Sequence, residues 1–204
     1  MRRNRLTMSW ALGHDQDMVM RHHRIVDTAV NAPMFLYQAP VGAGRMAYGA
    51  DILKDLVRLP NVVGVKEGSW ETAAYEANRR HIKEAAPDVG VMASGDEPLL
   101  TCFILGSEGS LVSLACLTPD LIIGLERAVR HGDMKAAQAA HETIYPLARA
   151  IYGTAPGYRA TARLKACLKL LGRLPDDQVR PPIERLPARE IERLSKTLES
   201  SGLL

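Results

Sequence analysis

Four short apolar runs, separated by stretches with helical patterning, constrain the fold of this 204-residue chain more than any other feature. Strands are expected at residues 33–37, 61–66, 89–94 and 109–114. Helices are expected between them, at roughly 47–58, 70–85 and 97–105. Alternation of strand and helix is typical of a right-handed parallel α/β sheet. We therefore expect a parallel sheet with helices packed over it.

The second apolar run ends in an amine. Residues 61–65 read NVVGV and are followed by Lys66 and Glu67, which predicts a strand that is buried on both faces. Reacting groups of such folds lie at the carboxyl ends of the strands, and partial burial favours the neutral form of a lysine. The neutral amine of Lys66 could condense with a ketone to form a Schiff base. The alternative is an ordinary lysine that leaves the strand for solvent, as most lysines do.

The first apolar run ends in a phenol, Tyr37, followed by the sequence QAP at 38–40. Lys66 lies 29 residues after Tyr37, a spacing that fits one helix, one strand and two loops. We therefore expect the two side chains to end neighbouring strands. The alternative for Tyr37 is a strand tyrosine whose hydroxyl simply finds a hydrogen-bond partner at the rim of the sheet.

Several stretches together carry a resemblance to a known family. They are LYQAP at 36–40, LPNVVGVKE at 59–67, SGD at 94–96, GSEG at 106–109, and the tail from VRPP at 179–182 to GLL at 202–204. In this combination, over about residues 15–204, the chain resembles the dihydrodipicolinate synthase and N-acetylneuraminate lyase family of Schiff-base-forming class I aldolases. The resemblance implies a (β/α)8 TIM barrel, with residues 15–30 matching the helix before strand five and the four runs matching strands five to eight.

The same resemblance implies a chemistry. Lys66 would form the imine with pyruvate or another 2-oxo acid, and Tyr37 would relay protons to and from it. Leu111, Gly95, Asp96 and Ser69 would bind the substrate. No cofactor and no metal are implied. The imine nitrogen would stabilise an enamine, which can add to an aldehyde, be released by retro-aldol cleavage, or expel a hydroxyl in a dehydration.

Three positions depart from the family pattern. Gly42 stands where the lysine-precursor synthases carry an arginine that grips the carboxylate of the aldehyde, although Arg45 follows three residues later. Trp70 replaces a small residue, and Cys116 replaces an asparagine. These departures favour a catabolic aldolase or dehydratase over the biosynthetic activity.

Length bears on the architecture, because a complete barrel takes about 250 residues. Residues 1–14 are unmatched and do not look like a compressed form of strands one to four, 15–117 are expected to form an N-terminally truncated barrel, and 118–204 a helical extension within the same single domain. Helices are expected there at 118–129, 133–152, 158–172 and 188–200. Strands one to four, which carry the threonines that hold the carboxylate in the family, have no match.

A half barrel would expose two sheet edges and an apolar face. Two explanations remain open: either two copies rebuild an eight-stranded ring, or the sequence is a truncated product or has a mispredicted start. The first agrees with a homo-oligomer. The alternative function is a catalytically inactive family member that serves as a subunit or interaction protein.

Composition and short motifs exclude several other classes. A net charge of +3 without a basic stripe, and 5% aromatic residues, argue against nucleic-acid binding. No apolar stretch follows the basic start, so no secretory signal or membrane span is expected, and three scattered cysteines suit the cytoplasm. The adjacent pair His22 and His23 is expected on a solvated helix face rather than at a metal, and the GAG sequence at 42–44 is too short for a phosphate loop.

Overall fold

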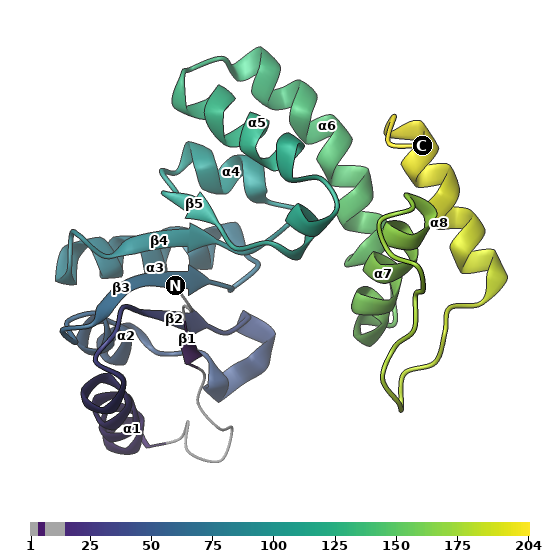
Figure 1. Ribbon diagram of the computed structural model, residues 1–204. Coiled ribbons are helices and arrows are strands. Elements are labelled where there is room, and N and C mark those ends of the chain that lie inside the picture. The colour runs from purple at the N-terminus through teal and green to yellow at the C-terminus, as the bar shows by residue number, and fades with distance from the viewer. Residues whose placement is uncertain (1–3, 7–14) are drawn as a thin grey trace. The chain divides into compact units, whose positions relative to one another are not determined.

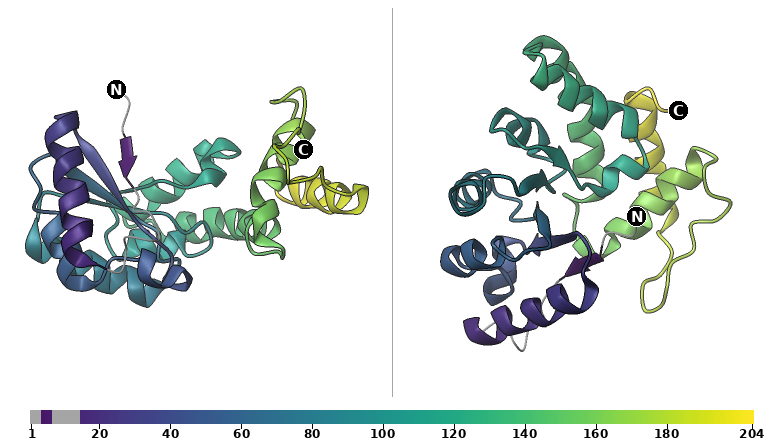
Figure 2. Two further views of the ribbon diagram at one scale, coloured as in Figure 1. Left: turned by 90° about the horizontal axis from the view of Figure 1, so that it is seen from below. Right: turned by 60° about the vertical axis from the view of Figure 1, so that its left-hand side comes forward.

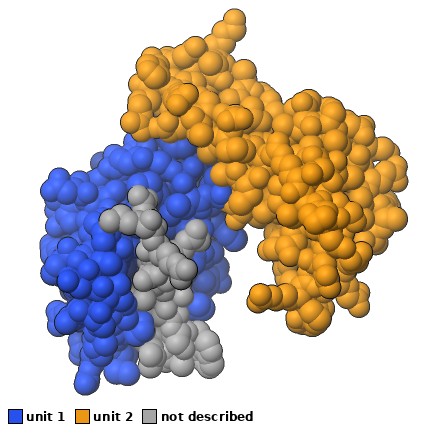
Figure 3. Space-filling model, in the orientation of Figure 1, with its two compact units in different colours: residues 1–112 blue, residues 113–204 orange. Residues whose placement is uncertain are grey.

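The computed structural model of the chain describes residues 4–6 and 15–204. The chain divides into two compact units, Met1–Val112 and Ser113–Leu204, which are coloured separately in Figure 3. This division falls a few residues before the expected end of the partial barrel at residue 117. Whether both units make up a single domain stays a prediction.

The first unit contains a parallel sheet of five described strands in the order β1-β2-β3-β4-β5 (Figure 1). The strands are β1 (Asn4–Leu6), β2 (Met34–Gln38), β3 (Val62–Glu67), β4 (Gly90–Ala93) and β5 (Gly109–Ser110). Every neighbouring pair is parallel, which confirms the predicted parallel α/β sheet. The sequence indicated four strands, and the structure adds a fifth, β1, which pairs with β2. A strand of three residues is too short to show the two-residue periodicity by which strands are recognised.

The helices of this unit are α1 (Gln16–Val30), the 3₁₀ segment η1 (Val41–Met46), α2 (Ala50–Leu56), α3 (Thr72–Ala85) and α4 (Leu99–Ile104). The predicted helices are confirmed, and α1 begins where the carboxylate of Asp15 accepts a hydrogen bond from the Met18 amide. In Figure 2, α1 to α4 lie on one side of the curved sheet. The strand expected at 109–114 is shorter than predicted, because β5 pairs only with β4 among the described strands. The chain continues into the 3₁₀ segment η2 (Ser113–Cys116).

The strand register separates the two faces of the sheet. Leu36, Val65 and Val91 lie side by side and are fully buried. Val63 is an exception, being 42% exposed, so the expectation that this strand is buried on both faces is wrong there. The register between β2 and β3 shifts at this point, since Met34 pairs with Val62 and the next residue pairs with Gly64. Val63 is therefore skipped in the pairing with β2, as the extra residue of a β-bulge would be.

The other face of the sheet is filled by large side chains that lie over glycines. The ring of Phe35 covers Gly64, where an added Cβ would lie 2.4 Å from Phe35 Cε1. The thioether of Met92 covers Gly109 in the same way, with its sulfur 2.9 Å from the position of an added Cβ. Tyr37 and Lys66 follow on the same face, one step closer to the carboxyl ends of β2 and β3.

The second unit is helical. Its helices are α5 (Pro119–Arg130), α6 (Met134–Ile151), the 3₁₀ segment η3 (Gly157–Arg159), α7 (Ala160–Leu170) and α8 (Ala188–Ser200), close to the predicted ranges. No helix in the described residues is long and apolar enough to cross a membrane.

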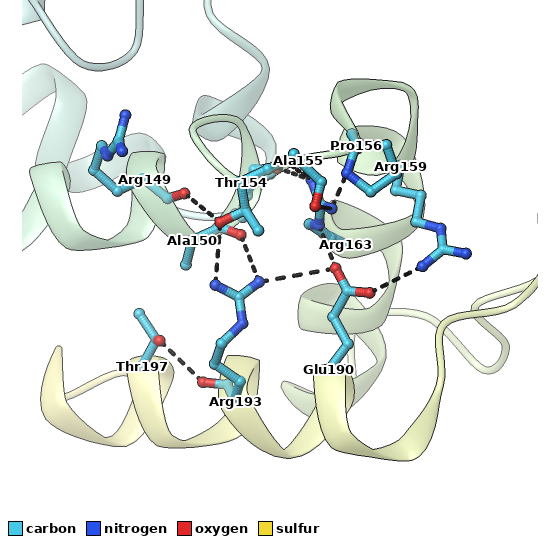
Figure 4. Close-up of polar contacts among 11 residues, drawn as sticks. Arg149, Ala150, Thr154, Ala155, Pro156, Arg159, Arg163, Glu190, Arg193 and Thr197 are labelled. Carbon is cyan, nitrogen blue, oxygen red and sulfur yellow. Dashed lines mark hydrogen bonds and ion pairs between the residues drawn. The ribbon is translucent and has the colours of Figure 1, made fainter.

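A buried guanidinium holds three of these helices together (Figure 4). Arg163 of α7 is fully buried, and its Nε donates to the Glu190 carboxylate of α8. Its remaining nitrogens donate to the carbonyl oxygens of Ile151, Thr154, Ala155 and Pro156, where α6 ends and the chain turns. Each donor of the fork therefore has an acceptor, and this accounts for the burial of a charged side chain.

Candidate functional site

Tyr37 and Lys66 meet at the carboxyl edge of the sheet. They are register partners on β2 and β3, which confirms that they end neighbouring strands. The Nζ atom of Lys66 lies 5.3 Å from the centroid of the Tyr37 ring, and both residues are partly buried. An amine and a phenol are thus held close enough to act on one small molecule.

The ring of Tyr37 rests on the backbone of the loop that follows β3. A Cβ added to Gly68 would lie 2.6 Å from Tyr37 Cε2 and 2.6 Å from the carbonyl oxygen of Gln38. The Gly68 amide donates to the same carbonyl at 3.0 Å. Glycine is required here because the loop approaches both the ring and the neighbouring strand more closely than a side chain would allow.

Behind Lys66, on the opposite face of β3, lies a buried carboxyl group. Glu67 is 1% exposed and accepts hydrogen bonds from the side-chain amide of Asn78 at 2.8 Å and from the hydroxyl of Ser69 at 2.9 Å. The Ser69 amide donates to both carboxylate oxygens at 3.3 Å. Burial raises the pKa of Glu67, and these hydrogen bonds oppose the increase. The alternation of side chains along a strand could have revealed Glu67 in the sequence, because it follows the candidate nucleophile directly.

A second buried network holds the loop that follows Tyr37. The side-chain amide of Gln38 donates to the carbonyl of Tyr48 and accepts from its amide, at 3.0 and 2.8 Å. Nε2 of His23 lies 3.1 Å from the Tyr48 hydroxyl, and Nδ1 lies 2.8 Å from the carbonyl oxygen of Val19. The expectation of a solvated face is therefore wrong for His23, which is fully buried because α1 turns it toward the loop. Burial lowers the pKa of His23.

The other predicted site residues of the first unit follow the strands at the same edge. Gly95 and Asp96 come after β4, and Gly95 is packed so closely that an added Cβ would lie 2.8 Å from the ring of Pro98. Leu111 comes after β5, is partly buried, and donates its amide to Ala93 at 2.8 Å. Ser69 is buried with its hydroxyl bonded to Glu67. Their role in substrate binding stays a prediction.

The departures from the family pattern are placed as follows. Trp70 lies in the loop after β3, is 61% exposed and has a left-handed backbone with a φ of 62°. Gly42 and Arg45 belong to η1, the segment that follows Tyr37. Cys116 is exposed and belongs to the second unit. In the described part of the chain, no group of three or more His, Cys, Asp or Glu side chains is arranged to hold a metal ion.

Comparisons with known proteins relate the whole of this arrangement to one family. Residues 13–201 match the model of the dihydrodipicolinate synthetase family. A 4-hydroxy-tetrahydrodipicolinate synthase from Methanoculleus marisnigri is 30% identical over 175 residues, which is 85% of this chain and 57% of the relative. The enzyme of the same name from Moorella thermoacetica is 29% identical over 93% of this chain and 62% of its own length. The chain thus spans about three fifths of the length of these two relatives.

The fold is also similar to solved structures. A prophage protein of the dihydrodipicolinic acid synthase family from E. coli K12, solved in complex with pyruvate, superposes with a TM-score of 0.83. The two chains are 23% identical, and the match covers 93% of this chain and 63% of that protein. The described sheet and helices are therefore part of a fold of the TIM-barrel type.

Proposed function

This chain belongs to the dihydrodipicolinate synthetase family, and on that premise we propose that it is a lyase that forms a Schiff base between Lys66 and pyruvate or a related 2-oxo acid. The observation that carries the proposal is the position of the Lys66 amine, 5.3 Å from the Tyr37 ring at the carboxyl edge of a parallel sheet. This edge is where folds of this type gather their reacting groups.

The chemistry follows from these two side chains. The neutral amine of Lys66 attacks the keto carbon of the oxo acid, and loss of water from the carbinolamine leaves a protonated imine. The imine withdraws electrons from the adjacent carbon, which loses a proton to give an enamine. The hydroxyl of Tyr37 would pass protons during both steps, as a general acid and base. The enamine then adds to an aldehyde, or expels a hydroxyl in a dehydration.

The substrate would lie along the same edge. We include Leu111, Gly95 and Asp96 in this site, since each follows the carboxyl end of β4 or β5. We include Ser69, which follows β3, through its backbone alone, because its hydroxyl is hydrogen-bonded to Glu67. The loop after β3 carries Trp70, whose bulk and exposure favour a substrate other than that of the biosynthetic synthases. A sugar-acid-like or aromatic 2-oxo acid, processed by catabolic cleavage or dehydration, is our proposal for the substrate class.

Assembly and location belong to the same proposal. Among the described strands, β1 and β5 each pair with a single neighbour, so an edge of each is available for pairing. This supports a homo-oligomer, and sedimentation of a well-folded monomer at micromolar concentration would contradict the assembly. The cytoplasmic location is proposed from the three scattered cysteines.

Reductive trapping tests the chemistry. The protein is incubated with millimolar pyruvate and borohydride, digested, and analysed by mass spectrometry for a covalent adduct. We expect the adduct on Lys66, loss of the adduct in Lys66→Arg, and slower trapping in Tyr37→Phe. Lys135→Arg, at an exposed position of α6, is the matched control and should react as the wild type does.

Two results of this experiment would contradict the proposal. A folded wild-type protein that acquires no adduct would overturn the proposal in favour of a catalytically inactive family member. An adduct on lysines other than Lys66 would show that the amine chosen here is the wrong one.

A further inference from the structure

We propose that Glu67 is a positioning residue, which fixes the loop that supports the ring of Tyr37 and thereby sets the distance between Tyr37 and Lys66. The inference rests on the proposed function, because it assigns a role in the same site. The chain of contacts runs from α3 through Glu67, Ser69 and Gly68 to the ring.

The first link anchors the carboxyl group. Asn78 of α3 donates to Glu67 Oε1 at 2.8 Å, and β3 holds the backbone of Glu67 in register with Gln38 on one side and Ala93 on the other. A carboxyl group buried to 1% exposure is stable only when its oxygens are hydrogen-bonded. The group is thus fixed at both ends, by the strand and by the helix.

The second link fixes Ser69. Its hydroxyl donates to Glu67 Oε2 at 2.9 Å, and its amide lies 3.3 Å from both carboxylate oxygens. The carbonyl oxygen of Ser69 accepts a hydrogen bond from the Val41 amide at 3.3 Å. Ser69 therefore connects the buried carboxyl group to the loop after β3 and to the start of η1, the segment that follows Tyr37.

The third link connects Gly68 to the ring of Tyr37. Gly68 lies between Glu67 and Ser69, so fixing these two residues also fixes its peptide. Its amide donates to Gln38 at 3.0 Å, and its Cα faces the Tyr37 ring without room for a methyl group. A shift of this peptide would move the surface on which the ring rests. The hydroxyl of Ser69 accordingly supports the site from behind the sheet.

A purely structural role for Glu67 would predict something different. Loss of its hydrogen bonds would then lower global stability and leave the Tyr37 ring in place whenever the protein folds. A positioning role predicts local loosening of Gly68 and slower imine formation in a protein that remains folded. Misplacement of a reacting group by about 1 Å can cost about a hundredfold in rate.

The test uses two substitutions of unequal severity. Ser69→Ala removes one hydroxyl, and Glu67→Gln keeps the volume of the side chain but weakens the hydrogen bonds. Glu76→Gln is the matched control, because it removes a carboxylate of α3 that pairs with Arg80 on the surface. Two quantities are measured in each folded variant: hydrogen–deuterium exchange of the Gly68 amide by NMR, and the rate of borohydride trapping with pyruvate.

In Ser69→Ala we expect faster exchange of the Gly68 amide and trapping slowed by about ten- to a hundredfold. In Glu67→Gln we expect smaller changes in the same directions. Glu76→Gln should give wild-type values for both quantities. Unchanged exchange at Gly68 in folded Ser69→Ala would overturn the inference. Should Glu67→Gln fail to fold, Ser69→Ala alone decides. If the wild type traps no pyruvate, the proposed function fails, while exchange at Gly68 still decides whether Glu67 fixes the loop.

Discussion

Replacing Gly68 by alanine is the most direct test of the close packing at the site. The added Cβ would lie 2.6 Å from Tyr37 Cε2 and 2.6 Å from the carbonyl oxygen of Gln38. Carbon atoms in contact are ordinarily about 3.5–4.0 Å apart, so the ring would have to retreat by about 1 Å. The carbonyl oxygen is less able to move, because it accepts the 3.0 Å hydrogen bond from Gly68.

We expect two consequences of this substitution. Overpacking of a well-packed site costs about 1–3 kcal/mol in the free energy of unfolding, which urea titration followed by circular dichroism would measure. Displacement of the Tyr37 ring would slow trapping of pyruvate on Lys66 by about a hundredfold. The second effect should persist in a protein that is folded, since Gly68 lies in a loop.

Gly49→Ala is the control for the loss of a glycine. No atom lies within 4 Å of the position of its Cβ, and its φ of −67° suits any residue. It should leave the rate of trapping at the wild-type value and lower the free energy of unfolding by no more than about 1 kcal/mol, because Gly49 is the N-cap of α2, where alanine is less favourable than glycine. The reasoning is refuted if the free energy of unfolding of Gly68→Ala lies within about 0.5 kcal/mol of the wild-type value and the variant traps pyruvate at the wild-type rate. The Tyr37 ring would then not rest on this backbone.

Three further predictions concern stability. Because burial raises the pKa of Glu67, its stabilising contribution is present below the pKa of the unfolded chain and is lost as pH rises through the higher folded pKa. The urea midpoint of the wild type should therefore fall relative to that of Glu67→Gln as the pH rises above about 4, and a pH-independent difference would contradict this. Arg163→Met should lower the free energy of unfolding by about 3–5 kcal/mol, because it removes the hydrogen bonds that a fully buried guanidinium donates to Glu190 and to four carbonyl groups; a loss under about 1 kcal/mol in urea titration would show that these contacts contribute little. Gly124→Ala, in the interior of α5 with no atom within 4 Å of the new methyl group, should raise the melting temperature and stabilise the chain by about 0.5–1 kcal/mol, whereas a decrease would indicate a contact that the structure does not contain.

The sequence was sufficient for the order of the elements. The strands and helices could be recognised because apolar runs and the residues that end them are local patterns in the sequence. β2, β3 and β4 lie within a residue or two of the predicted ranges. The pairing of Tyr37 with Lys66 also followed from the sequence, because parallel strands joined by one helix are neighbours and their carboxyl ends meet at one edge.

Features that depend on partners distant in the sequence were not predictable in this way. β1 is a strand only because β2 lies beside it, and β5 ends early because no described strand pairs with its other edge. Val63 is exposed because the register shifts against β2, a shift that no periodicity within β3 reveals.

The burial of polar groups was likewise not predictable from the sequence. Nothing in the sequence near His23 or Glu67 shows that Tyr48 and Asn78 will come within hydrogen-bonding distance of them. A polar side chain is stable in the interior only when such partners are present, and packing alone brings the partners there. The sequence by itself determined which reactive groups end the strands, because local patterns fix the direction of the chain. Only the tertiary structure decided what supports these groups from behind, because hydrogen bonds between distant segments fix the position of each side chain.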